Sequence, residues 1–109
     1  QVSARAASAA RDAREAYRRA FEEAMRGLDV VVTPTLPVEP FPLSVDELEV
    51  RDRLTENTFP FNALGAPALA LPAGRTRGGL PASLQVVGRP GDDALVLAAG
   101  ALIERALAG

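Results

Sequence analysis

Apolar residues recur at helical spacing near the start of the chain and predict a helix over residues 3–28. Its apolar stripe consists of Tyr17, Phe21, Ala24 and Leu28. Two acids each stand four residues before an arginine, in the pairs Glu15 with Arg19 and Glu22 with Arg26. Such pairs are expected on the solvent face, so the pattern is that of an amphipathic helix.

The pattern then changes to a short β-branched run, which predicts a strand over residues 30–33. Because consecutive positions are apolar, this strand is expected to be covered on both faces, as in the parallel sheet of an α/β protein. Four prolines between residues 34 and 43 end the strand and predict an extended loop.

Two helical segments are predicted in the middle of the chain. Residues 44–47, Ser-Val-Asp-Glu, have the spacing of a capping box and begin a helix predicted over residues 45–56. A short helical passage follows between Thr58, which can cap its start, and Gly65, which can adopt the left-handed conformation that ends a helix.

The last part of the chain predicts a hairpin and a helix. Residues 68–71 and 83–87 are candidate strands joined by a glycine-rich turn. A final helix is expected to begin at Asp92 or Asp93 and to run through Leu107.

This final helix is apolar nearly all round, so it is expected to be buried on more than one side. A chain of 109 residues has little to cover it with. We therefore expect a contiguous apolar patch that involves Val31, Leu95 and Leu102, where further polypeptide or a second copy would pack.

Composition restricts the chemistry. The chain of 109 residues favours one domain or part of one, here a single and incomplete domain over residues 1–109. All twelve of its cationic residues are arginine, and histidine, lysine and cysteine are absent. These absences exclude a histidine- or lysine-activated nucleophile, thiol chemistry and the usual zinc sites within this chain. We expect no metal and no cofactor.

The net charge of −2 provides no basic field for nucleic acid and no polybasic membrane patch. The absence of cysteine fits a reducing compartment, so a cytoplasmic protein is expected. The chain begins at Gln1 rather than at methionine. This start indicates either a trimmed terminus or, as we expect, a segment of a longer protein.

No set of residues forms a catalytic site by itself. The four serines, Ser3, Ser8, Ser44 and Ser83, have no base partner in the sequence and are interpreted as structural. The acidic pair at residues 92–93 could bind a metal, but acids are favoured at a helix start for electrostatic reasons.

Six short strings, in this order and spacing, resemble the C-terminal part of the amidase signature family over about residues 8–107. They are DVVVTPT (29–35), TFPFNALGAPA (58–68), LPAG (71–74), GLP (79–81), LQVVG (84–88) and DAL (93–95). The resemblance implies an α/β fold: the C-terminal part of a mixed sheet with flanking helices. It also implies hydrolysis or transfer of amides by a serine in a Gly/Ser-rich loop, served by a second serine and a lysine, all N-terminal to the matched region.

This chain has no Gly-Gly-Ser-Ser string and no lysine, so no catalytic residue is carried over. The resemblance implies a C-terminal part of an amidase that contributes fold and pocket wall. Its partner would be the remainder of the amidase polypeptide, or a second copy. The alternative is a stand-alone, non-catalytic α/β assembly module derived from that family.

The resemblance also marks three candidate residues at the margin of the substrate pocket. Thr58 and Asn62 fall at polar positions of the family's motif. Thr58 is expected to face the pocket margin and Asn62 to tie loop backbone together. The alternative is that Thr58 only caps a helix and Asn62 only satisfies local carbonyls. Gln85, in mid-strand, is expected to pair with backbone.

Thr55, the third candidate, bears on the substrate. The A subunits of glutamine-dependent tRNA amidotransferases, which this stretch also resembles, carry an acid three residues before the motif threonine. Here that position is Thr55, and Glu56 is one residue out of register. A neutral hydroxyl offers no charge to a buried ammonium, which favours a simple or hydrophobic amide.

Overall fold

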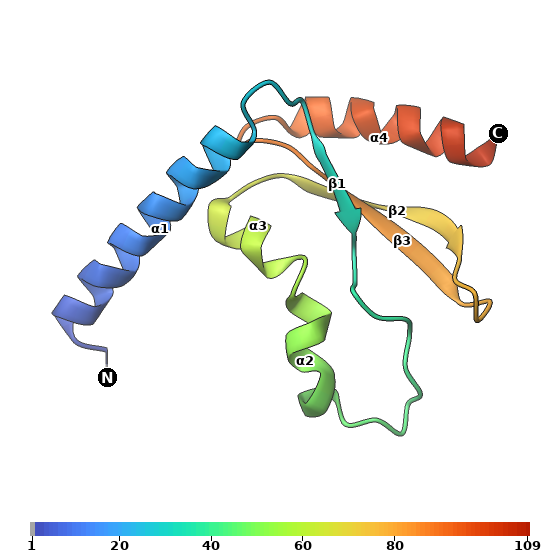
Figure 1. Cartoon of the computed structure of the whole chain (residues 1–109), viewed down its shortest axis with the longest axis horizontal. Coiled ribbons are helices and arrows are strands. Elements are labelled where there is room, and N and C mark those ends of the chain that lie inside the picture. The colour runs from blue at the N-terminus through green and yellow to red at the C-terminus, as the bar shows by residue number, and fades with distance from the viewer. Residues whose placement is uncertain (1) are drawn as a thin grey trace.

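The computed structural model describes residues 2–109 as a flat molecule of 51 × 41 × 18 Å (Figure 1). Its elements, in order, are α1 (Ala4–Ala24), β1 (Val31–Pro34), α2 (Glu47–Thr55), α3 (Phe59–Leu64), β2 (Ala68–Arg75), β3 (Pro81–Val87) and α4 (Asp93–Ala108). The α/β class is confirmed, and each predicted helix and strand is present.

The three strands form one sheet in the order β1-β3-β2. β2 and β3 form the predicted hairpin, with both strands longer than the sequence indicated. β1 runs antiparallel to β3, with Val32 opposite Val86. The expectation of a parallel sheet is wrong for these strands, because β1 pairs in antiparallel orientation with β3, the second strand of the hairpin.

β1 is also an edge strand whose two faces differ in burial. Val31 and Thr33 are half-buried, whereas Val32 is 50% exposed. The prediction that both faces of this strand are covered is therefore wrong. A run of β-branched residues favours a strand, but it does not determine how many neighbours that strand acquires.

The core lies on both sides of β3. Val86 and Val87 are 0% exposed, and neighbouring side chains in a strand point to opposite faces. On one face, Val86 forms a buried cluster with Leu71 and with Val96 of α4. On the other face, Gln85 meets the segment that joins α2 to α3. β3 is therefore the central element around which the helices are placed.

α4 approaches the sheet closely at a glycine. A Cβ atom on Gly100 would lie 2.3 Å from Cδ2 of Leu69, so any other residue at this position requires the Leu69 side chain to move. The flanks of this buried face are open: Leu95 and Leu102 on one side and Leu97 on the other are 40%, 62% and 61% exposed. Burial on more than one side is therefore not observed. Leu95 and Leu102 of the predicted patch are exposed, Val31 is half-buried, and the contiguous patch itself stays a prediction.

α1 makes little contact with the rest of the chain. It has no buried residue, and Tyr17 of its apolar stripe is 39% exposed. Phe21 alone makes an aromatic contact, edge-on against Phe61 of α3 with 6.3 Å between ring centroids. Of the stripe, only Phe21 is half-buried, whereas Tyr17, Ala24 and Leu28 are exposed.

The predicted ion pairs of α1 form with other partners. Glu15 pairs with Arg18, and Glu23 pairs with Arg26, both three residues apart. Glu22 lies 3.9 Å from Arg89, which precedes α4. The predicted pairs Glu15 with Arg19 and Glu22 with Arg26 are therefore wrong. These side chains are long and flexible, so each acid pairs with whichever arginine the folded chain places nearest.

Two of the predicted helix caps also differ. Asp46 caps α2 by accepting a hydrogen bond from the Leu48 backbone N–H at 2.9 Å, so the capping box at Ser44 is wrong. Thr58 makes no side-chain cap on α3, whereas Gly65 adopts the predicted left-handed conformation with φ of 69°. Among residues 2–109, no helix has the length and apolar character needed to cross a membrane.

Candidate functional site

The two candidate threonines lie on either side of the α2–α3 junction. Thr55 ends α2 and is exposed, and its hydroxyl donates to the carbonyl of Arg51 at 3.3 Å. Thr58 is half-buried, and its hydroxyl donates to the carbonyl of Thr55 at 3.4 Å. Both hydroxyls therefore donate to carbonyls in the last two turns of α2, and the Thr55 carbonyl also accepts from the Thr58 N–H at 3.1 Å.

Asn62 lies on α3 and is exposed. Within the part of the chain that the structure describes, its side-chain amide makes no hydrogen bond, while its backbone carbonyl accepts from Gly65 at 3.1 Å. The backbone tie expected of Asn62 is made instead by Asn57, whose amide donates to the carbonyl of Pro34 at 3.0 Å. Sequence reasoning missed Asn57, although an asparagine between two helices is a common turn residue.

Gln85 is the buried polar residue of the molecule's core, with 4% exposure. Its amide donates to the hydroxyl of Thr33 at 3.1 Å and to the carbonyl of Asn57 at 2.9 Å. The expected pairing of Gln85 with backbone is confirmed. These bonds join β1, β3 and the α2–α3 junction, so Gln85 fixes Thr55 and Thr58 relative to the sheet.

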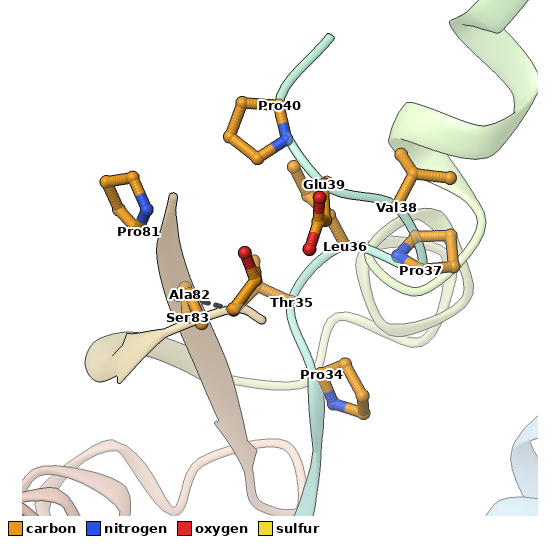
Figure 2. Close-up of a pocket in the computed structure, with 11 residues that line it drawn as sticks. Pro34, Thr35, Leu36, Pro37, Val38, Glu39, Pro40, Pro81, Ala82 and Ser83 are labelled. Atoms are coloured by element: carbon orange, nitrogen blue, oxygen red, sulfur yellow. Dashed lines mark hydrogen bonds between the residues drawn. The ribbon is translucent and has the colours of Figure 1, made fainter. Parts of the chain in front are cut away.

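A hollow of about 310 Å³ lies beside the loop that follows β1 (Figure 2). Residues 34–40, Thr76 and residues 81–83 line it. The loop is attached to β3 through Thr35 and Ser83, whose hydroxyl oxygens are 2.8 Å apart. Thr55, Thr58 and Asn62 do not line this hollow, so the structure does not bring the three candidates together with it.

Two of the serines make structural hydrogen bonds. Ser3 caps α1 by accepting from the Ala6 N–H, and Ser83 pairs with Thr35. Among residues 2–109, no three acidic, histidine or cysteine side chains gather to form a metal site. No lysine or histidine exists in the sequence to accept a proton from a serine.

The comparisons with known proteins decide the family. A sequence model of the family described as Amidase matches residues 1–97. The chain belongs to the amidase family. The short strings that carried the resemblance all lie within the matched region.

Relatives and solved structures agree with this assignment. The chain is 40% identical over 98 residues to the A subunit of the glutamyl-tRNA(Gln) amidotransferase of Rhizorhabdus wittichii, covering 88% of this chain and 20% of that protein. An amidase crystal structure superimposes with a TM-score of 0.83 at 35% identity, over 95% of this chain and 25% of that one. A 6-aminohexanoate cyclic dimer hydrolase gives 0.75 at 28% identity, over 98% of this chain and 25% of that one.

The chain thus spans about a fifth of the length of this amidotransferase relative. It spans 47% of an uncharacterized protein encoded in the nthA 5' region of Rhodococcus erythropolis, with 36% identity over 94 residues and 81% of this chain covered. It matches a C-terminal part of amidase-signature proteins.

Proposed function

We propose that this chain forms the C-terminal part of an amide hydrolase and supplies the fold and one wall of the substrate pocket. The observation that carries the proposal is the superposition on an amidase structure over 95% of the chain, at 35% identity. The serine nucleophile and its lysine would lie on the remaining polypeptide, since this chain contains no lysine. Residues 1–109 would then be one incomplete domain.

Thr55, Thr58 and Asn62 are proposed to lie at the margin of that pocket. The Gln85 hydrogen bonds support a fixed position for the two threonines, because they hold the α2–α3 junction against the sheet. Thr55 is uncharged, and its hydroxyl is directed to the Arg51 carbonyl. A site with this residue favours a simple or hydrophobic amide over one that bears an ammonium group.

The partner proposed for the exposed faces is the remainder of an amidase polypeptide. Leu97 and Leu102 on α4 and Val32 on β1 are each at least half exposed, and β1 and β2 are both edges of the sheet. Unpaired strand edges and apolar helix faces favour association with further strands and helices. We place the complete protein in the cytoplasm, which the absence of cysteine supports.

The test is a chimera in which residues 1–109 replace the corresponding region of the solved amidase that superimposes with a TM-score of 0.83. The chimera is expected to hydrolyse a neutral aryl amide, whereas the chain alone is expected to show no turnover. A folded chimera without activity, beside an active parent amidase, would favour the alternative of a non-catalytic assembly module. Turnover by the chain alone, abolished by changing one of its four serines, would overturn the proposal.

A further inference from the structure

The hollow between the loop after β1 and the start of β3 has rigid walls. Pro34, Pro37, Pro40 and Pro81 line it, and each proline has a fixed φ (Figure 2). The loop is held to β3 twice through Thr35: its N–H donates to the Ser83 carbonyl at 3.1 Å, and its hydroxyl meets the Ser83 hydroxyl. The cavity is therefore largely formed before any ligand enters, which lowers the entropic cost of binding.

The lining contains many hydrogen-bond acceptors and no cationic side chain. Prolines contribute carbonyls but no N–H group, and the Thr35 N–H already donates to Ser83. The hydroxyl oxygens of Thr35, Thr76 and Ser83 retain acceptor lone pairs. No arginine is among the lining residues. An anion would find no positively charged side chain here and would meet the Glu39 carboxylate.

Glu39 provides the single charged group of the lining. Its carboxylate extends from the loop to the β2–β3 turn, where Oε2 would lie 3.3 Å from a Cβ atom on Gly78. The acids that form ion pairs within residues 2–109 are Glu15, Glu22, Glu23 and Glu47, so the Glu39 charge is not neutralised by an arginine. In the view of Figure 2, this carboxylate is drawn between Pro40 and Thr35.

We infer that this hollow binds a primary alkylammonium ion, with the ammonium at Glu39 and the alkyl chain against the prolines. An ammonium supplies three N–H donors to a lining that offers acceptors, and its positive charge pairs with the unneutralised carboxylate. A volume of about 310 Å³ accommodates a chain of several carbons. The inference does not depend on amide hydrolysis, because binding is measured on the chain itself.

The test is a titration of the ¹⁵N-labelled chain with n-hexylammonium, followed by amide chemical shifts. Saturable shifts are expected at Thr35, Glu39 and Ser83, and hexanoate at the same ionic strength should produce none. Glu39→Gln should weaken hexylammonium binding about two- to fivefold, the effect of an exposed ion pair. Ala82→Leu, which fills the hollow and leaves the carboxylate in place, should abolish the shifts.

Glu104→Gln on α4 is the matched control, since it removes one exposed negative charge away from the hollow and should leave the affinity unchanged. Arg77→Gln removes a cation next to Gly78 and should tighten binding. Equal binding of hexanoate, or an unchanged affinity in Glu39→Gln, would overturn the inference. A loss of affinity in Arg77→Gln would also overturn it.

Discussion

Gln85 shows how a single side chain determines the arrangement of three segments. It is 4% exposed and donates to Thr33 of β1 and to the backbone of Asn57. No buried side-chain nitrogen or oxygen in residues 2–109 lacks a hydrogen-bond partner. A residue of this kind stabilises one arrangement, because any other leaves a buried amide unpaired.

Gln85→Leu should therefore lower the free energy of unfolding by about 1–3 kcal/mol, since the Asn57 carbonyl and the Thr33 hydroxyl lose their partner. Urea unfolding followed by circular dichroism measures the change. Asn62→Ala is the control: Asn62 is exposed on α3, so its replacement should alter stability by no more than about 0.5 kcal/mol. Similar effects of the two changes would contradict the assigned role of Gln85.

Replacement of Thr55 can test whether the complete enzyme prefers a neutral substrate over one that bears an ammonium group. In the complete amidase, Thr55→Asp should raise the ratio of kcat/KM for glutamine over a neutral amide by about tenfold, because a carboxylate pairs with the substrate ammonium. Ser44→Asp adds the same charge before α2 and should leave this ratio unchanged. An unchanged ratio in Thr55→Asp would count against a place for Thr55 at the pocket margin.

At the scale of elements, the contact between α4 and the β-hairpin holds the sheet and the last helix together. Gly100 allows this contact, because any side chain there meets Leu69 of β2. Gly100→Leu should lower the free energy of unfolding by about 1–3 kcal/mol through overpacking. Ala101→Leu introduces the same side chain on the exposed face of α4, so it should change stability by less than about 0.5 kcal/mol.

Both variants are compared by thermal and urea unfolding, with near-ultraviolet circular dichroism to detect displaced packing. If Gly100→Leu were as stable as Ala101→Leu, α4 would not approach the sheet as closely as the structure shows.

At the scale of the molecule, the flat shape leaves apolar surface on both α1 and α4. Dimensions of 51 × 41 × 18 Å allow one thin core, centred on β3. α4 exposes Leu95 and Leu102 on one side and Leu97 on the other, and these surfaces are proposed to meet further amidase polypeptide.

The paired change Leu95→Gln and Leu102→Gln should reduce both self-association and apolar-dye fluorescence of the chain, because it removes two leucines from the exposed face of α4. Sedimentation velocity and dye titration measure the two effects. Leu43→Gln is the control, since Leu43 is fully exposed in the loop before α2. A parent chain that is monomeric and does not bind the dye would contradict the predicted patch.

The sequence determined the positions of the elements. Helical spacing placed α1 and α4, the β-branched run placed β1, and the glycine-rich turn placed the hairpin, because these signals depend on residues close together in the chain. The family also followed from the sequence, since its motif strings are local. The absence of lysine and histidine settled that the chain by itself carries no Ser-Lys or Ser-His pair.

Only the tertiary structure decided how the elements meet. The antiparallel pairing of β1 with β3 joins strands that lie far apart in the chain, and local periodicity contains no information on such a pairing. The same holds for the hydrogen bond from Gln85 to Asn57, and for the choice of Arg89 as the partner of Glu22. Caps and ion pairs differed from expectation because several residues of suitable chemistry compete for one partner, and three-dimensional proximity selects among them.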